Sequence, residues 1–137
     1  MIIKSRAKLV EGFKSVIDNG RAHSVVTDLP EKLGGTDKGP TALELAVMGL
    51  AGCISTIFTL VAKKMKVQVE ALEVEVEAEK PDTAATITSA TVITKVKSPA
   101  DEETIKKVYE LTLKNCPVGV LFEKAGVKVT HKVEKIS

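Results

Sequence analysis

One apolar stretch near the middle of the chain interrupts an otherwise alternating pattern of hydrophobic and polar residues. Residues 43–62 read LELAVMGLAGCISTIFTLVA, and Glu44 is the only charged residue among them. This stretch predicts one long helix over residues 41–65. Because apolar or small residues occupy nearly every face of the helix, it must be covered on all sides by a membrane or by protein. We expect the rest of the chain to wrap around it.

On both sides of this helix, hydrophobic residues alternate with polar ones at a period of two, which is typical of half-buried strands. The alternation predicts strands over 2–10, 13–17 and 21–27 before the helix, and over 67–79, 86–97 and 127–136 after it. Asp18-Asn19-Gly20 predicts a hairpin turn, because Asn and Gly accept positive φ angles. In 86–97 the alternation leaves open which face of the strand is buried.

Local signals mark both ends of the long helix. Thr41 and Glu44 fit a capping box, in which a Thr side chain and a carboxylate three residues later satisfy each other's backbone amides. Lys63, Lys64 and Lys66 fall at the other end, where cations suit the negative end of the helix dipole. The helix is therefore expected to begin at Thr41.

A second helix is predicted from Ser98, as its N-cap, to about residue 113, with Pro99 in its first position. Its apolar stripe comprises Ile105, Val108, Tyr109 and Leu111. Asn115-Cys116-Pro117 breaks this helix. A short helix then follows over 118–124, with Cys116 as its predicted N-cap.

The order of elements indicates an α+β fold in which antiparallel sheets pack against helices. At 137 residues the chain is large enough for a real core, so we expect a single domain over residues 1–137. One chain of this size has little material to cover a long helix on every side. Gly49 and Gly52 give the helix a small surface for close approach, and the sequence therefore predicts an intertwined homodimer.

Composition argues against several classes of function. The formal net charge is +2 and aromatic residues make up 3% of the chain, which disfavours a dedicated nucleic-acid binder. The N-terminus has no long apolar core with a cleavage site, so a cytoplasmic protein is expected. Glu44, Ser55, Thr56 and Thr59 dilute the apolar stretch, which disfavours a membrane span. No CxxC or HxxxH spacing indicates a metal site.

The two cysteines are the main candidates for chemistry. A reactive cysteine needs its pKa lowered by a positive neighbour or a helix N-terminus. Cys116 has the start of the short helix, whereas Cys53 lies in mid-helix and needs a cation from elsewhere. Arg6 and Arg21 are the only arginines of the chain. The alternative is that each cysteine is only a small buried hydrophobe.

The two histidines, His23 and His131, are expected to have ordinary structural roles, with His131 at the surface or at a sheet edge. Apolar neighbours surround Cys53 in the sequence. A pocket lined by Leu50, Ile54, Ile57 or Phe58 would suit an alkyl chain.

Residues 39–53, GPTALELAVMGLAGC, resemble the motif of the OsmC/Ohr family (osmotically inducible protein C and organic hydroperoxide resistance proteins). The second cysteine of that family lies in a segment similar to Cys116-Pro117-Val118. LEVEVEAE at 72–79 and VKVTHKVE at 127–134 also fit. The resemblance implies an OsmC-like fold, an intertwined homodimer with active sites near its interface, and thiol-dependent peroxidase chemistry without a cofactor or metal.

The same resemblance implies roles for individual residues. Cys53 would attack an organic hydroperoxide and become a sulfenic acid, and Cys116 would resolve it as a disulfide. An external dithiol would then reduce the pair. Family members use an arginine and a glutamate to activate the nucleophile; Arg21 is the better candidate here, with Arg6 the alternative. The family's glutamate position holds Leu43 in this chain, so the adjacent Glu44 is either catalytic or only a helix cap.

These departures place the chain nearer the broader OsmC-like branch of the family, and two other functions stay open. The first is an OsmC-like dimer that binds an apolar or acyl-bearing small molecule without turnover. The second is a thiol–disulfide exchange protein that acts on a partner.

Overall fold

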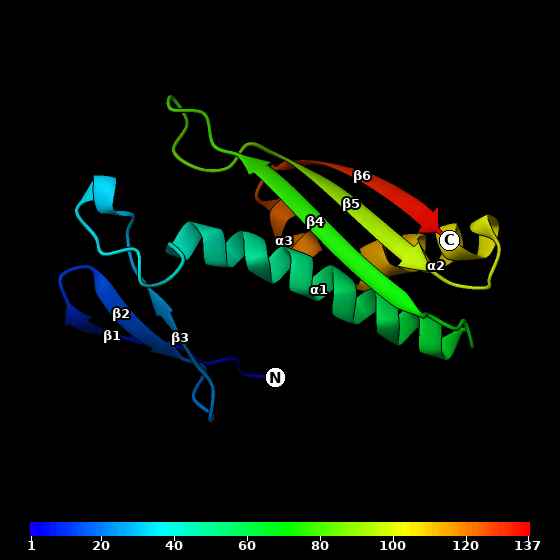
Figure 1. The fold of residues 1–137 in the computed structure, drawn as a ribbon, viewed down its shortest axis with the longest axis horizontal. Helices are drawn as coiled ribbons and strands as arrows, with labels where there is room; N and C mark the ends of the chain where they lie inside the picture. The colour runs from blue at the N-terminus through cyan, green and yellow to red at the C-terminus, as the bar shows by residue number, and fades with distance from the viewer. The chain divides into compact units, whose positions relative to one another are not determined.

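The computed structural model describes residues 1–137 (Figure 1). Its elements are β1 (Arg6–Glu11), β2 (Lys14–Asp18), β3 (Ser24–Thr27), a 3-10 helix η1 (Glu31–Leu33), α1 (Ala42–Lys64), β4 (Ala71–Glu79), β5 (Ser89–Lys97), α2 (Glu102–Asn115), α3 (Pro117–Lys124) and β6 (Lys128–Ile136). All six predicted strands and all three predicted helices are present, so the α+β class is confirmed. The chain divides into two compact units, Met1–Ala46 and Val47–Ser137, and the single domain expected over 1–137 stays a prediction.

The N-terminal unit contains an antiparallel sheet in the order β1-β2-β3. The first strand begins later than its alternating sequence predicts. Arg6 is paired with Asp18, and the chain leaves β2 directly after Asp18, so residues 2–5 have no strand to pair with. Alternation is therefore not sufficient for a strand: a partner of matching length must also exist.

The predicted hairpin turn joins β2 to β3, but it is longer than expected. The Asp18 carboxylate accepts a hydrogen bond from the Gly20 amide at 2.9 Å, and the Asn19 side chain accepts one from the Arg21 amide at 3.0 Å. Gly20 has a φ of 76°, which favours glycine. Because these bonds hold the turn open as far as His23, β3 begins at Ser24 rather than Arg21.

Asp28 organises the loop that leads into α1. Its side chain is buried, with 3% exposed. The carboxylate accepts hydrogen bonds from the Thr36 hydroxyl at 2.6 Å, the Thr36 amide at 3.2 Å, the Lys38 amide at 3.1 Å and the Leu29 amide at 2.8 Å. These bonds favour the charged form, led by that from the Thr36 hydroxyl, and lower the pKa of Asp28 to about 2.

The start of α1 confirms the predicted capping box. The Glu44 carboxylate accepts a hydrogen bond from the Thr41 amide at 3.0 Å, and the Thr41 hydroxyl accepts one from the Glu44 amide at 3.1 Å. Farther along, α1 buries one stripe at helical spacing, made of Leu50, Ile54, Phe58, Val61 and Ala62. Each large side chain of this stripe contributes about 1.5–3 kcal/mol by leaving water.

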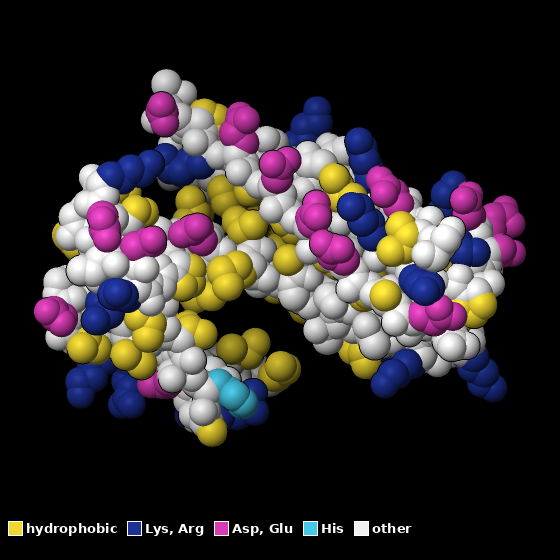
Figure 2. Space-filling view, viewed as in Figure 1, with side chains coloured by type: hydrophobic (Ala, Val, Ile, Leu, Met, Phe, Trp, Pro, Cys, Tyr) yellow, Lys and Arg dark blue, Asp and Glu magenta, His cyan; other side chains and the backbone are white.

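Within the C-terminal unit, α1 is covered only in part. Met48 is 55% exposed and Leu60 is 50% exposed. The helix is long and apolar enough to cross a membrane, and 28% of its most apolar window is buried. Figure 2 shows hydrophobic side chains exposed over α1 and over the N-terminal sheet. The C-terminal unit thus buries one face of α1 in its core and leaves another face without cover from its own residues.

The C-terminal unit contains a mixed sheet in the order β4-β5-β6. β4 runs antiparallel to β5, with Val76 opposite Val92, whereas β6 runs parallel to β5, with His131 opposite Val92. The prediction of antiparallel sheets is therefore wrong for β6. A parallel pair needs a crossover connection, and α2 and α3 provide it between β5 and β6.

The register that the sequence left open in β5 is now defined. The buried face of β5 carries Ala90, Val92, Thr94 and Val96. Ala90, Val92 and Val96 belong to one hydrophobic core together with the buried stripe of α1. The core thus lies between this face of the sheet and the helices.

Two details of α2 differ from the sequence prediction. Its N-cap is Asp101, whose carboxylate accepts a hydrogen bond from the Thr104 amide at 2.8 Å. Ser98 instead donates its hydroxyl to the carbonyl of Gln68. Thr112 rather than Leu111 completes the buried stripe, because a residue seven positions after Ile105 returns to the same face.

We expect Asp28→Ala to loosen the loop before α1 without affecting the C-terminal sheet. Without the carboxylate, the amides of Leu29, Thr36 and Lys38 lose their acceptor, so their hydrogen exchange accelerates. Exchange measured by NMR in β4–β6 should stay unchanged. Glu31→Ala, an exposed acidic position of the same loop, is the matched control and should exchange as the native protein does.

The native protein should show the same loosening in acid. The pKa of Asp28 in the fold is below its ordinary value, so its stabilising contribution is complete above that ordinary value of 3.8 and disappears as the pH falls through about 2. Exchange of these three amides that does not depend on Asp28 would contradict this role of the carboxylate.

Candidate active site at the paired thiols

Cys53 lies in the middle of α1, where the helix enters the core. Leu50 lies three residues before it and Ile54 directly after it, and both are fully buried. Cys53 itself is half-buried. The buried stripe of α1 therefore fixes the rotation of the helix and directs this thiol to the edge of the core.

Cys116 lies at the junction of α2 and α3 and is fully buried. As predicted, it is the N-cap of α3, with Pro117 in the first turn. Its Sγ accepts a hydrogen bond from the Gly119 amide at 3.3 Å. A Cβ added at Gly119 would lie 3.3 Å from this sulfur, tighter than most Cβ contacts, so glycine at this position lets α3 pack closely against the thiol.

The two sulfurs lie 3.0 Å apart, although they are 63 positions apart in the sequence. Both cysteines are free thiols. A disulfide bond is about 2.05 Å long, so a movement of about 1 Å would join them. The fold thus holds two thiols at a distance from which a bond between them needs little rearrangement.

The expectation that the start of the short helix lowers the pKa of Cys116 is wrong. Burial and the contact with Cys53 raise the pKa of Cys116 to about 11, and the Gly119 amide only partly opposes them. Removing the sulfur from water disfavours the thiolate by more than one amide stabilises it. Cys116 is therefore a neutral thiol at neutral pH.

A histidine also belongs to this site, and the sequence analysis assigned it a structural role. His131 lines a small cavity that Cys116 also lines, along with Leu50, Ile54, Leu113, Gly119, Glu123 and Val129. Its Nδ1 atom lies 2.7 Å from the Tyr109 hydroxyl oxygen. The alternation of β6 contains the signal that was missed: Val129 and Val133 are apolar, so His131 between them lies on the same, core-facing side of the strand.

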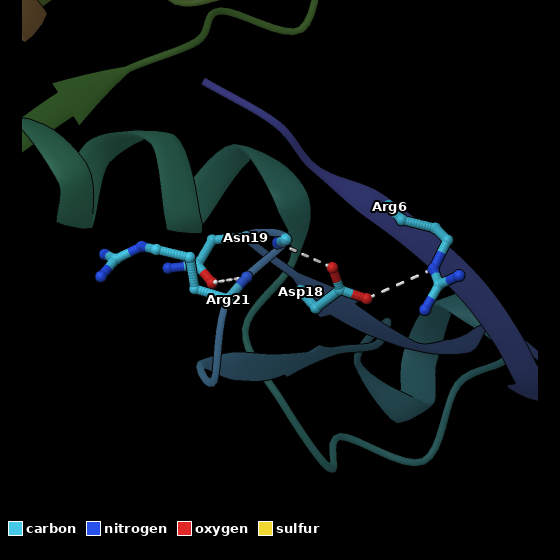
Figure 3. A network of polar contacts seen from close by, with 5 residues as sticks. Arg6, Asp18, Asn19 and Arg21 are labelled. Atoms are coloured by element: carbon cyan, nitrogen blue, oxygen red, sulfur yellow. Dashed lines mark hydrogen bonds and ion pairs between the residues drawn. The ribbon is translucent and has the colours of Figure 1, made fainter. Parts of the chain in front are cut away.

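The activating residues suggested by the resemblance belong to the N-terminal unit. Arg6 Nε is 3.4 Å from the Asp18 carboxylate, and its side chain is exposed. Figure 3 shows the Arg21 guanidinium pointing away from this ion pair. Arg21 bonds to Asn19 through its backbone amide only. Glu44 uses Oε1 in the capping box, and its Oε2 has no hydrogen bond.

No group of three or more His, Cys, Asp or Glu residues lies close enough together to hold a metal ion. The site therefore consists of two adjacent sulfurs, a histidine–tyrosine pair beside one of them, and apolar side chains. Together with the fold, the site defines an α+β protein in which Cys53, in a long apolar helix, contacts Cys116 at the start of a second helix.

Comparison with known proteins identifies the family. The model of the family described as OsmC-like protein matches residues 35–132, which span both cysteines, and the chain therefore belongs to the OsmC-like family. No curated protein sequence matches the chain.

Solved structures share the fold at low sequence identity. An OsmC-like protein from Mycoplasma pneumoniae has a TM-score of 0.86 at 19% identity, with 100% of this chain and 99% of that chain covered. An organic hydroperoxide resistance protein OsmC from Legionella pneumophila has a TM-score of 0.74 at 15% identity, with 98% and 97% covered. An OsmC-like protein of unknown function from Vibrio cholerae has a TM-score of 0.81 at 12% identity, with 97% and 99% covered. At these identities the likeness establishes the fold alone.

The contribution of the capping box to the start of α1 can be measured through stability. Glu44→Gln keeps an oxygen that accepts from the Thr41 amide, so its free energy of unfolding should stay within about 0.5 kcal/mol of the native value. Thr41→Ala removes the side-chain cap and should cost about 1 kcal/mol. Urea denaturation measures both. A loss as large in Glu44→Gln as in Thr41→Ala would mean that the carboxylate charge itself is required for the helix start.

Proposed function

We propose that this protein is a cysteine-based peroxidase that reduces organic hydroperoxides. The observation that carries the proposal is the 3.0 Å separation of the Cys53 and Cys116 sulfurs. Cys53 is half-buried and can meet a small substrate. Cys116 is buried beside it and can react with the oxidised Cys53. Some structurally similar proteins are named organic hydroperoxide resistance proteins, which supports the same activity here.

The reaction has three steps. The Cys53 thiolate attacks one peroxide oxygen, the O–O bond breaks, and the other oxygen takes a proton and leaves as an alcohol, so that Cys53 becomes a sulfenic acid. The Cys116 sulfur then attacks the Cys53 sulfur, the S–O bond breaks, and hydroxide takes the thiol proton of Cys116 and leaves as water. An external dithiol finally reduces the disulfide and is itself oxidised. No cofactor takes part.

Arg21 is our candidate for the cation that favours the Cys53 thiolate. A guanidinium stays charged in a half-buried site, where a lysine can lose its proton. Arg6 is already paired with Asp18, whereas the Arg21 side chain has no ion pair. Glu44 is the candidate for a second activating group, because one of its carboxylate oxygens has no hydrogen bond.

The working form of the protein is, in this proposal, a cytoplasmic homodimer. The uncovered face of α1 contains Met48, Gly49, Gly52 and Leu60. A Cβ added at either glycine would meet nothing within 4 Å in this chain, so this face is open to close approach by a second helix. A second copy would bury the apolar surface that one chain leaves exposed.

Peroxide consumption with a dithiol reductant tests the activity. We expect native protein to consume cumene hydroperoxide catalytically and Cys53→Ser to lose at least about 100-fold in rate, because the nucleophile is gone. Without the reductant, Cys116→Ser should reduce one equivalent of hydroperoxide and accumulate the Cys53 sulfenic acid, detected by mass spectrometry. Ser55→Ala, on the same helix, is the control and should retain the native rate.

Equal rates for native protein and Cys53→Ser would refute the peroxidase. In that case, mixed disulfides trapped by Cys116→Ser would indicate the thiol–disulfide exchange protein. A small molecule retained in native mass spectrometry by both cysteine variants would indicate the binding protein.

The two arginines form a matched pair for testing the activation of Cys53. Arg21→Gln should lower kcat/KM for the hydroperoxide by about tenfold or more, because it removes a charge that stabilises the thiolate. Arg6→Gln should lower it far less. The reverse order would assign the activating role to Arg6, and equal native-like rates would assign it to neither.

A further inference from the structure

A small polar cluster is buried in the C-terminal unit, on the face of the sheet that meets the helices. It consists of Thr94 on β5, Tyr109 on α2 and His131 on β6. The Tyr109 hydroxyl oxygen lies 2.7 Å from His131 Nδ1, and the two rings meet edge to face with centroids 5.6 Å apart. Thr94 is fully buried, and its Oγ1 is the one buried side-chain N or O atom without a hydrogen-bond partner.

Burying such groups in an apolar core is costly. Each hydroxyl or imidazole leaves water for a core that is mostly aliphatic and aromatic. An apolar residue at each position would pack there without that penalty. The polar cluster therefore requires an explanation beyond packing, and its position beside Cys116 offers one.

Cys116 has to lose its proton before it can attack Cys53. Burial holds its pKa near 11, so at neutral pH only a very small fraction is thiolate. The titratable groups that line the same cavity as Cys116 are His131 and Glu123. Glu123 is exposed, whereas His131 is half-buried and lies on the core face of β6. A thiol in this position needs a base that reaches it from inside the site.

The cavity between these residues has room for one water molecule. The space open to the centre of a water molecule is about 10 Å³. This is close to the minimum volume that holds one water. Cys116, His131 and Glu123 supply polar groups around it. A water bound there can pass a proton between two side chains that do not touch.

We propose that His131, positioned by Tyr109, is the proton acceptor that activates Cys116, through one water molecule bound in the cavity that both residues line. The Cys116 proton passes to the water as the water gives a proton to His131 Nε2. The Cys116 sulfur attacks the Cys53 sulfur, the S–O bond of the sulfenic acid breaks, and the leaving hydroxide takes the proton back to form water. This inference rests on the proposed function, because the peroxide supplies the sulfenic acid.

The polar cluster can hold His131 in the tautomer that this role requires. In the tautomer that this role requires, His131 Nδ1–H donates to the Tyr109 oxygen, 2.7 Å away. Nε2 is left with a free lone pair. In this arrangement Tyr109 is a positioning residue, since it acts only through the imidazole.

The surroundings of His131 favour the neutral base. Burial lowers its pKa, and the exposed Glu123 carboxylate of α3 opposes this only in part. From α2 it faces Tyr109, whose own pKa burial raises, so the phenol stays protonated. The α1 residues that line the cavity, Leu50 and Ile54, are uncharged. One charged residue, Lys135, follows His131 on the same side of β6. It is paired with Val96 of β5 and lies four positions after His131.

The test uses an aromatic disulfide reagent that releases a coloured thiolate, so that it needs no peroxide. Cys53 attacks the reagent, releasing one thiolate and leaving a mixed disulfide on Cys53. Cys116 then attacks Cys53, forms the Cys53–Cys116 disulfide and releases a second thiolate, while its proton goes to His131 and on to solvent. The rate of the second release, followed by stopped-flow absorbance, measures the activation of Cys116 alone.

We expect His131→Gln to slow the second release at least about tenfold and to leave the first unchanged, because a positioned base typically contributes more than that. Tyr109→Phe should slow it less. The pH profile excludes a merely structural effect: the native rate should be flat from about pH 7 to 9, whereas the His131→Gln rate should rise about tenfold per pH unit, following the thiolate fraction of Cys116. His23→Gln, the other histidine, is the control.

A His131→Gln variant with a native rate and a flat profile would overturn the proposal. So would loss of the second release in Glu123→Gln together with a native rate in His131→Gln, since the base would then be Glu123. If His131→Gln does not fold, Tyr109→Phe decides the matter: a native rate of the second release in that variant would overturn the proposal. The two proposals can also fail separately. If the variants slow the second release but the native protein consumes no peroxide, the role of His131 is supported and the peroxidase is refuted.

Discussion

The structure of the C-terminal unit depends on one constraint: the apolar helix α1 must bury a stripe of its surface. Leu50, Ile54 and Phe58 follow one another at four-residue spacing and are all fully buried. Cys53 lies between the first two, so the packing that stabilises the fold also sets the direction of the thiol. A change that rotated α1 would move the sulfur away from Cys116 and expose the core in the same step.

The second thiol is held by a different kind of local structure. The chain leaves α2 at Asn115 and enters α3 at Pro117, and Cys116 lies between them with an extended backbone. This geometry requires no long-range information beyond the packing of the two helices. This position affects the pKa of Cys116 in two opposite ways. The amide of Gly119 stabilises the thiolate, whereas burial disfavours it more strongly. The position at a helix start therefore does not by itself determine how reactive the Cys116 thiol is.

Much of the fold could be predicted from local patterns. The capping box of Thr41 and Glu44 defined the start of α1, and the alternation of Val and Glu in β4 identified both faces of that strand. The N-cap of α2 was mistaken because Ser98 and Asp101 are both good caps, and only the hydrogen bond from Ser98 to Gln68, a residue far away in sequence, distinguishes them. The parallel pairing of β6 was missed because its alternating pattern is the same for either direction.

In the candidate site, too, some features follow from local sequence and others depend on long-range packing. Both cysteines were selected from sequence, since free thiols are few and the resemblance pointed to them. The contact of their sulfurs depends on how α1 packs against the turn between α2 and α3, which no local pattern contains. The alternation of β6 predicts that His131 faces the core. Its proposed role in chemistry depends on Tyr109 and Cys116, which belong to α2 and to the turn between α2 and α3.

The position of β6 in the chain has a consequence for how the protein matures. The α2–α3 crossover separates β6 from β5 in the sequence, so their pairing is of long range and is expected to form late in folding. Until β6 docks, the core face around Cys116 is open to solvent. The same thiol that is protected in the finished fold is therefore exposed to oxidants on the ribosome and during refolding. The protection of Cys116 from oxidants is therefore expected to depend on the docking of β6.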